Sequence, residues 1–192
     1  KKRLARGGMA EVFLGEDQLL GRPVAVKVLF PEFASDPNFV ERFRREAQAA
    51  ANLSHPNIVG VFDWGKERNT YYIVMEYVEG RTLSQIIRQE GPFPAARVAE
   101  IADGIASALG FAHEGDVVHR DMKSGNVIIS NTGQIKVADF GIATAISTSS
   151  DADLTQAGAV MGTANYFSPE QAQGLTVDGR SDLYSLGVVM YE

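Results

Sequence analysis

Cysteine is absent from the 192 residues of the sequence. Disulfide bonds, cysteine-based zinc sites and thiol catalysis are therefore excluded, and a reducing compartment is compatible with the chain. Long apolar runs are also absent, since no stretch approaches the roughly 18 apolar residues of a membrane-spanning helix. We therefore expect no membrane contact from this segment, and its first residues, KKRLARGG, lack the apolar stretch of a signal peptide.

Basic residues are fewer than acidic ones, because 18 lysines and arginines stand against 24 aspartates and glutamates, for a formal net charge of −6. Domains that bind nucleic acid usually carry a basic excess, so we expect no nucleic-acid partner. The remaining composition, 45% hydrophobic and 22% charged, is that of an ordinary globular protein with enough apolar material for a core.

The residue pattern divides the chain into a strand-rich first part and a mainly helical second part. Alternating and β-branched residues predict strands in residues 1–28 and in the segments NIVGVFDWG and TYYIVMEYV. Between them, SDPNFVERFRREAQAAANL predicts a helix that Ser35 or Asp36 caps, with Pro37 in its first turn. TLSQIIRQE and AARVAEIADGIASALGFAHEG predict two more helices, and the change between the two parts falls near residues 78–81.

A charged cluster lies in the stretch VVHRDMKSGNVIIS. The apolar runs Val117–Val118 and Val127–Ile129 predict short buried strands on either side of it. The loop between them holds a histidine, an arginine, an aspartate, a lysine and an asparagine, which is more polar function than a turn requires. A loop fixed at both ends can hold reactive groups still, so this segment is a candidate catalytic loop.

Three other features indicate a phosphate-binding site. The turn in LARGGMAEV is small enough for close backbone approach to a phosphate, although a plain hairpin turn is an equal alternative. Lys27 lies in the apolar strand VAVKVL and needs a partner, for which Glu46, near the apolar face of the following helix, is a candidate. Asp121, Asn126 and Asp139 carry the oxygen atoms that Mg²⁺ prefers.

Six short motifs follow one another in the order of the protein-kinase signature: GGMAEV, VAVK with Lys27, Glu46, HRDMKSGN, DFG and SPE. On these motifs the chain resembles the eukaryotic-type protein kinases over essentially its whole length. The stretches FRREAQAAANLSHPNIV, GIATA, GTANYFSPEQAQG and RSDLYSLGVVMYE resemble the bacterial, especially the actinobacterial, receptor-type Ser/Thr kinases.

The resemblance implies an α+β, bilobal protein-kinase fold. Residues 1–78 would form a small β-rich N-lobe with one helix that binds the nucleotide, and residues 79–192 a larger, mainly helical C-lobe. Kinase domains of the family continue with several more helices, so we expect both ends to be cut, the C-lobe to be truncated and the apolar face of LGVVMYE to be poorly covered. The resemblance also implies that Asp182 caps and braces the catalytic loop.

The implied activity is that of an ATP-dependent serine/threonine protein kinase, which transfers the γ-phosphate of ATP to Ser or Thr hydroxyls of protein substrates with Mg²⁺ or Mn²⁺ as the metal. Asp121 would accept the hydroxyl proton, and Lys123 would steady the transferred phosphate. Lys27 would contact the α- and β-phosphates, held in place by Glu46. Lys123, two residues after Asp121, follows the Ser/Thr pattern and not the tyrosine pattern.

The resemblance also implies a set of nucleotide-binding residues, in which Asn126 and Asp139 hold the metal. The set is Leu4, Ala5, Gly7, Gly8, Val12, Ala25, Lys27, Met75, Glu76, Val78, Lys123, Asn126, Ile128 and Asp139. The apolar sandwich around the base would be formed by Leu4, Val12, Ala25 and Ile128. Met75 takes the gatekeeper position, and Glu76 and Val78 would offer backbone groups to adenine. The chain departs from the family pattern at Ala5 and Ala10, which replace the outer glycines of the Gly-rich loop, and at Ser124, where proline is common.

Regulation is expected through the loop from Asp139 to Glu170. In such kinases the arginine before the catalytic aspartate, here Arg120, pairs with a phosphorylated loop and orders it. Thr155 is the candidate autophosphorylation site, with residues 147–150 as weaker candidates and an unphosphorylated loop as the alternative.

Three other functions are alternatives to catalysis. They are a pseudokinase scaffold that binds nucleotide without catalysis, a small-molecule phosphotransferase of related fold, and a receptor fragment that forms a homodimer through the N-lobe. The complete set of motif residues argues against the first. The resemblance implies that GTANYFSPE forms the peptide-docking floor of a protein kinase, which argues against the second. The family implies a cytoplasmic domain, compatible with a single-pass membrane protein whose anchor is not in this chain. We interpret His55, His113, His119 and Trp64 as packing residues.

Overall fold

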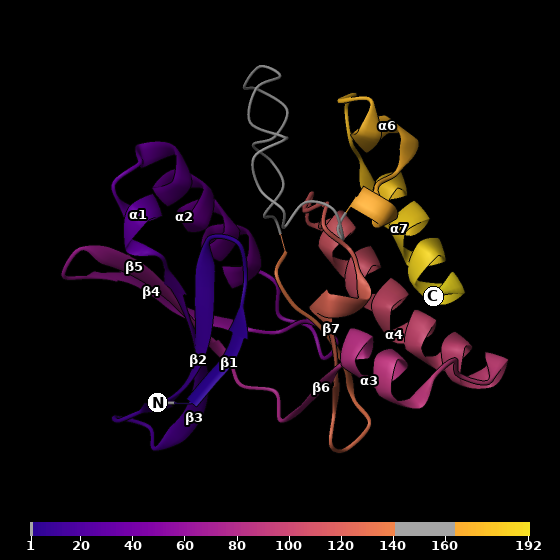
Figure 1. The fold of residues 1–192 in the computed structure, drawn as a ribbon, viewed down its shortest axis with the longest axis horizontal. Coiled ribbons are helices and arrows are strands. Elements are labelled where there is room, and N and C mark those ends of the chain that lie inside the picture. The colour runs from indigo at the N-terminus through magenta and orange to yellow at the C-terminus, as the bar shows by residue number, and fades with distance from the viewer. Residues whose placement is uncertain (1, 141–163) are drawn as a thin grey trace.

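The computed structural model describes residues 2–140 and 164–192, which form two lobes side by side (Figure 1). The elements of the N-lobe are β1 (Lys2–Arg6), β2 (Ala10–Asp17), β3 (Arg22–Leu29), α1 (Pro31–Ala34), α2 (Pro37–Ala51), β4 (Val61–Glu67) and β5 (Thr70–Glu76). The C-lobe contains β6 (Gly80–Thr82), α3 (Leu83–Glu90), α4 (Ala95–Glu114), η1 (Ser124–Asn126), β7 (Val127–Ser130), β8 (Ile135–Val137), η2 (Ala164–Tyr166), α6 (Pro169–Ala172) and α7 (Gly179–Tyr191).

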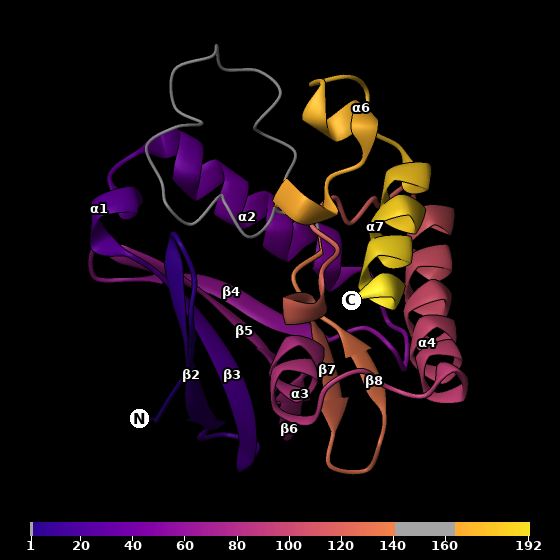
Figure 2. The same cartoon turned by 45° about the vertical axis from the view of Figure 1, so that its right-hand side comes forward.

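The N-lobe is built on one antiparallel sheet with the strand order β1-β2-β3-β5-β4. Helix α2 lies beside the sheet and packs against β4 (Figures 1 and 2). The core between them includes Leu29, Phe43, Ala47 and Ile73. This agrees with the expected N-lobe of strands, although a short helix, α1, precedes the expected one.

Helix α2 begins where the sequence predicts. The carboxylate of Asp36 accepts a hydrogen bond from the backbone N–H of Asn38 at 2.8 Å, and Pro37 occupies the first helical turn. Such a cap satisfies one of the free N–H groups at the start of a helix. The helix turns Phe43 and Glu46 into the interior, so the carboxylate of Glu46 is buried as its position in the apolar stripe indicates.

Helix α4 is the centre of the C-lobe, and the small sheet β6-β7-β8 packs against it. The strand predicted at Val127 is present as β7. The strand predicted at Val117–Val118 is wrong, because this pair forms no ladder. The N–H of Val117 instead donates to the carbonyl of Ala112 at the end of α4, and the Val117 side chain packs on the C-lobe core.

The two lobes are joined both by the chain and by hydrogen bonds. The N–H of Val59 donates to the carbonyl of Val137 at 2.9 Å, and the N–H of Val137 donates to the carbonyl of Asn57 at 2.8 Å. The chain itself crosses between β5 and β6, where a side chain on Gly80 would collide with the carbonyl oxygen of Ile129. These contacts attach the segment that leads into the N-lobe strand β4 to the C-lobe strand β8.

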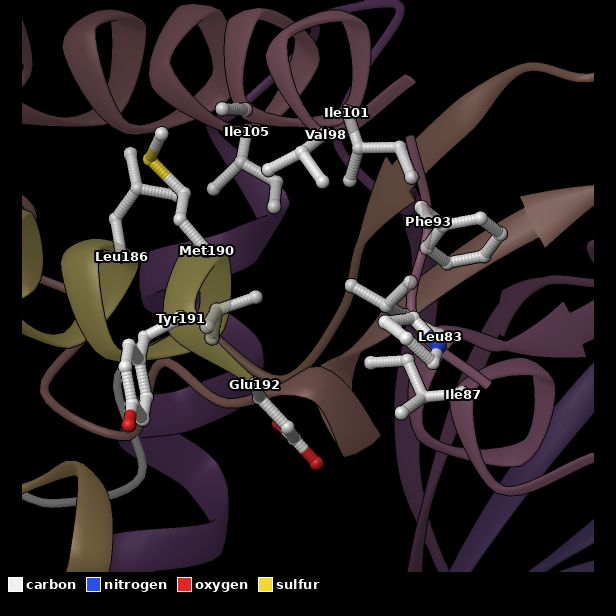
Figure 3. Close-up of a pocket in the computed structure, with 13 residues that line it drawn as sticks. Leu83, Ile87, Phe93, Val98, Ile101, Ile105, Leu186, Met190, Tyr191 and Glu192 are labelled. Carbon is white, nitrogen blue, oxygen red and sulfur yellow. The ribbon is translucent and has the colours of Figure 1, made fainter. Parts of the chain in front are cut away.

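An apolar hollow of about 190 Å³ opens between α3, α4 and α7 (Figure 3). Ile101 and Ile105 of α4 point into it opposite Leu186 and Met190 of α7. Met190 and Tyr191 are exposed, so the apolar face of α7 is poorly covered, as expected. None of the helices within residues 2–140 and 164–192 combines the length and apolarity that crossing a bilayer requires.

The close packing of α4 on β8 can be tested at two glycines of the helix. A Cβ atom at Gly104 would lie 2.9 Å from the Cβ of Ile135 in β8, whereas a Cβ at Gly110 would meet nothing within 4 Å. Gly104→Ala should therefore lower the free energy of unfolding by about 1–3 kcal/mol through overpacking. Gly110→Ala, the matched control, should raise it by about 1 kcal/mol through helix propensity. Urea unfolding of both variants measures this, and stabilisation by Gly104→Ala would contradict the packing described.

Candidate active site

The loop between α4 and β7 is held by one buried carboxylate, that of Asp182 in α7. Its Oδ2 atom accepts a hydrogen bond from the backbone N–H of His119 at 2.8 Å, and its Oδ1 atom accepts one from the N–H of Arg120 at 2.8 Å. The Nε2 atom of His113 lies 2.7 Å from Oδ2. Asp182 thus braces the loop as expected. His119 is fully buried and bonded to the carbonyl of Ala138, so His113 and His119 have structural contacts.

Three of the expected catalytic-loop residues, Asp121, Lys123 and Asn126, bond to one another just after the residues that Asp182 holds. The ammonium group of Lys123 donates to Oδ2 of Asp121 at 2.7 Å. The side-chain amide of Asn126 donates to the carbonyl of Asp121 at 2.8 Å and to its Oδ2 atom at 3.1 Å. The Asp121 carboxylate is therefore oriented by two neighbours through one oxygen.

A second charged cluster lies where the two lobes meet. The Nζ atom of Lys27 in β3 is 2.5 Å from Oε1 of Glu46 in α2 and 3.0 Å from Oδ1 of Asp139, which follows β8. The predicted partner of Lys27 is thus present, together with a second partner that is 112 residues away in the sequence. One buried ammonium group joins three elements of the fold.

The charges of this cluster follow from burial and pairing. Burial raises the pKa of Glu46 to about 7 against the opposing effect of Lys27, and its Oε2 atom has no hydrogen-bond partner among the described residues. Burial alone would lower the pKa of Lys27, but Asp139 and Glu46 outweigh it and hold that pKa above its ordinary value. Burial would also raise the pKa of Asp139, but Lys27 outweighs it and the pKa is lowered. Lys27 and Asp139 therefore both carry charge.

Two residues of the site have a backbone conformation that residues other than glycine rarely adopt. Arg120 has φ of 65° and Asp139 has φ of 63°. Such conformations cost on the order of 1–3 kcal/mol each and cluster at functional sites. The Nε atom of Arg120 is also buried without a hydrogen-bond partner in the described part of the chain. Strain and an unsatisfied donor are thus concentrated beside the two aspartates of the site.

The predicted metal ligands Asn126 and Asp139 fit a magnesium ion by their donor atoms. Within the described residues, Asn126 uses its amide nitrogen towards Asp121 and its amide oxygen makes no hydrogen bond, while Asp139 bonds to Lys27 through Oδ1. Residues 2–140 and 164–192 contain no group of three or more His, Cys, Asp or Glu side chains that could hold a metal ion. A site with one carboxylate and one amide oxygen suits Mg²⁺, which usually takes its other ligands from phosphates and water.

Most of the residues expected around the base lie in one apolar cluster. The buried side chains of Ala25 and Met75 and the half-buried side chains of Val12, Val78 and Ile128 belong to it. Ala25 and Met75 are paired across β3 and β5, while Ile128 reaches the cluster from β7 of the C-lobe. The cluster therefore contains side chains from both lobes, as a sandwich around a base requires.

The other residues predicted to bind the nucleotide lie in the edge strand β1 and in the turn that follows it. Leu4 is 37% exposed and lies outside the apolar cluster. Ala5 is paired with Val12 across β1 and β2, and Gly7 and Gly8 form the exposed turn between these strands. The N–H of Gly7 donates to the carbonyl of Ala10 at 2.8 Å, which closes the turn.

The side chain of Glu76 has a partner that sequence reasoning missed. The buried Lys136 of β8 donates to Oε2 of Glu76 at 2.8 Å and to the carbonyl of Ile58 at 3.2 Å. The same carboxylate oxygen accepts from the N–H of Gly60 at 3.1 Å. Lys136 stands in the apolar run IKV, so the argument that a buried lysine needs a partner applied to it as well as to Lys27.

The sequence predictions that fall between residues 141 and 163, which are Thr155 and the weaker candidates at residues 147–150, lie outside the described residues. The other two structural interpretations are consistent with the contacts. The ring of His55 stacks on Phe111 with centroids 5.1 Å apart, and the ring of Trp64 stacks on Tyr71 at 5.7 Å.

Comparisons with known proteins agree with this arrangement. The family model of the protein kinase domain matches residues 1–192. The chain is 49% identical over 186 residues to the serine/threonine-protein kinase PrkC of Bacillus subtilis and 52% identical over 193 aligned positions to the serine/threonine-protein kinase PknB of Mycobacterium leprae. These alignments cover 97% and 98% of the chain but only 28% and 31% of the two relatives.

A solved structure shares the fold. The crystal structure of the Mycobacterium tuberculosis PknI kinase domain matches with a TM-score of 0.77 and 34% identity, over 99% of this chain and 69% of that one. The two lobes, the order of the motifs and the match of the family model along the whole chain lead to one conclusion. The chain belongs to the protein kinase family and covers part of a kinase.

Proposed function

We propose that the chain carries the catalytic site of an ATP-dependent serine/threonine protein kinase, which transfers the γ-phosphate of ATP to Ser or Thr hydroxyls of proteins. One observation carries the proposal: two charged clusters, Asp121–Lys123–Asn126 and Lys27–Glu46–Asp139, are both complete. Curated relatives about half identical to the chain are named serine/threonine-protein kinases.

The chemistry of phosphoryl transfer explains this density of charge. The reaction needs little covalent help from the protein, and positioning and charge neutralisation supply most of the rate. Asp121 would orient the substrate hydroxyl and accept its proton through Oδ1, since Oδ2 is engaged by Lys123 and Asn126. Lys123 would then steady the transferred phosphate.

The nucleotide would be held from both lobes. Lys27 would contact the α- and β-phosphates, while Glu46 fixes its position. Asn126 and Asp139 would hold Mg²⁺, which neutralises charge on the phosphates when it is bound. The base would lie in the apolar cluster beside Met75, with backbone groups of Glu76 and Val78 facing its edge.

Regulation by autophosphorylation at Thr155 is part of the proposal. The support is Arg120, whose guanidinium Nε atom is buried without a partner among the described residues. An arginine with unused donors is a suitable receiver for a phosphate group. A homodimer through the N-lobe and a place in the cytoplasmic part of a membrane protein remain predictions.

The test of the proposed function is Asp121→Asn in the full-length protein. We expect the wild type to incorporate phosphate from γ-labelled ATP with Mg²⁺, in part at Thr155, and the variant to lose roughly 10²–10⁴-fold in rate because it lacks the proton acceptor. Mass spectrometry of the phosphorylated sites shows whether Thr155 is one of them.

Asp116→Asn is the matched control, because Asp116 is exposed and its φ of 60° suits asparagine as well as aspartate. It should keep wild-type activity. A wild-type protein that binds ATP but incorporates no phosphate would establish the pseudokinase alternative instead.

The raised pKa of Glu46 leads to a prediction about stability and pH. The group has an ordinary pKa of 4.5 and a folded-state pKa of about 7, so the folded chain keeps a proton that the unfolded chain loses between these values. The stability that this group contributes is full below about pH 4.5 and is lost as the pH rises through about 7. Relative to Glu46→Gln, the wild type should therefore lose melting temperature as the pH rises from about 5 to about 8.

Glu41 on the same helix provides the control for this measurement. It is half-buried in the structure, and hydrogen bonds from Arg44 and Arg45 lower its pKa to about 2. It is ionised in the folded state and largely ionised in the unfolded state throughout the window, so the difference between wild type and Glu41→Gln should vary little with pH. A difference for Glu46→Gln that is equally flat would contradict the protonation assigned to Glu46.

A further inference from the structure

Ser124 connects the catalytic loop to η2, which lies near the end of the loop from Asp139 to Glu170. It is buried, with 1% of its surface exposed, and its Oγ atom lies 3.1 Å from the hydroxyl oxygen of Tyr166 in η2. Ser124 stands directly after Lys123, at the position where proline is common in the family. A proline there could not make this contact, because it has no side-chain hydroxyl.

The direction of the hydrogen bonds follows from the partners of Tyr166. The tyrosine hydroxyl donates its one proton to the carboxylate Oε2 of Glu192 at 2.6 Å. The bond between Ser124 and Tyr166 must therefore run from the serine hydroxyl to the tyrosine oxygen. The result is a chain of two hydrogen bonds, Ser124 to Tyr166 to Glu192, in which each bond polarises the next.

The segment of Tyr166 is bound to the catalytic loop at a second point. The side-chain amide of Gln171 in α6 donates to the carbonyl of Arg120 at 2.7 Å. Arg120 and Ser124 flank the three residues from Asp121 to Lys123 on either side. The segment is anchored on α7 as well, since the hydroxyl of Ser185 donates to the carbonyl of Tyr166 at 2.7 Å.

We propose that Ser124 is a positioning residue that acts through Tyr166 to set the distance between the catalytic Asp121 and the surface that carries the protein substrate. The inference rests on the proposed kinase function and on the position of η2 and α6 beside the catalytic loop. Residues 164–170 belong to the segment GTANYFSPE, which the family resemblance assigns to peptide docking. Within the described residues no hydrogen bond or ion pair joins Ser124 to Asp121, Lys27 or Asp139, so its loss should affect transfer to a peptide and leave the nucleotide site intact.

The experiment compares Ser124→Ala, Ser124→Pro, Tyr166→Phe and the double variant Ser124→Ala/Tyr166→Phe in the full-length protein. Proline removes the hydroxyl of Ser124 together with its backbone N–H, which also faces the hydroxyl of Tyr166, so Ser124→Ala is the variant that isolates the side-chain hydrogen bond. We expect kcat/KM for a Ser/Thr peptide to fall about 3- to 10-fold in both Ser124 variants, the size expected for one hydrogen bond. The KM for ATP and the rate of ATP hydrolysis by water should stay at the wild-type values.

The double variant separates positioning from general damage. Once the tyrosine hydroxyl is gone, removal of the serine hydroxyl has nothing further to disconnect, so the double variant should be no worse than Tyr166→Phe. Ser84→Ala is the control, because Ser84 lies on α3 and its hydroxyl makes one long contact, 3.4 Å to Arg88, within the described residues. It should behave as the wild type.

Each outcome decides one of the two proposals. A wild type that binds ATP but phosphorylates no peptide refutes the kinase function itself. An active wild type with unchanged Ser124 variants refutes the role of Ser124, as do additive effects in the double variant. A loss that appears equally in the KM for ATP or in hydrolysis by water also overturns it, because it would show that Ser124 supports the fold and not the docking of the peptide.

Discussion

The buried ammonium group of Lys27 is the interaction on which the arrangement of the site depends. It comes from β3 and is paired with a carboxylate from α2 and another from the segment after β8. Taking such charges out of water costs several kcal/mol for each ion, so the cluster persists only while every partner is in place. Removing either carboxylate would leave the remaining charges poorly compensated. The position of α2 and the position of Asp139 are therefore linked through one side chain.

The catalytic loop is held by a different device. Asp182 has almost no exposed surface, and within the described residues no lysine or arginine side chain forms an ion pair with it. It is satisfied by two backbone N–H groups of the loop and by His113. Hydrogen bonds from backbone donors stabilise a buried carboxylate without an opposite charge. They also fix the conformation of the loop, including the positive φ of Arg120, which explains how a strained backbone is maintained there.

The sequence was sufficient where a local rule applied. The cap at Asp36 and the partner of Lys27 followed from helix-capping preferences and from the cost of a buried charge. The strand predicted at Val117–Val118 was wrong, because a two-residue apolar run says that it is buried but not whether a neighbouring strand is available to pair with it. Lys136 could have been found by the argument used for Lys27.

Contacts between distant segments could not be derived from pattern alone. The bond between Lys27 and Asp139 spans 112 residues, and the bond between Ser124 and Tyr166 joins two loops whose approach is set by the packing of α7. The sequence distinguishes Ser124 only by its departure from the proline that is common at this position in the family. Its hydroxyl acquires meaning once the structure places the hydroxyl of Tyr166 beside it. A departure from a family pattern is thus interpretable only with the contacts that the new side chain makes.

The departures in the Gly-rich loop can be judged in the same way. On one side of the proposed nucleotide site, polar contacts hold the N-lobe to β8. Lys136 of β8 bonds to Glu76, and the N–H of Val59 donates to the carbonyl of Val137 in β8. On the other side, Gly7 and Gly8 form an exposed turn, which the hydrogen bond from the N–H of Gly7 to the carbonyl of Ala10 closes. Ala5 also lies on this exposed side, in a strand with no buried residue. Alanine in place of glycine therefore adds a methyl group at Ala5 where little packs against it. Of the three glycines in the family pattern this sequence keeps only Gly7, which Gly8 follows, and the phosphate-binding role proposed for the turn depends on these two residues.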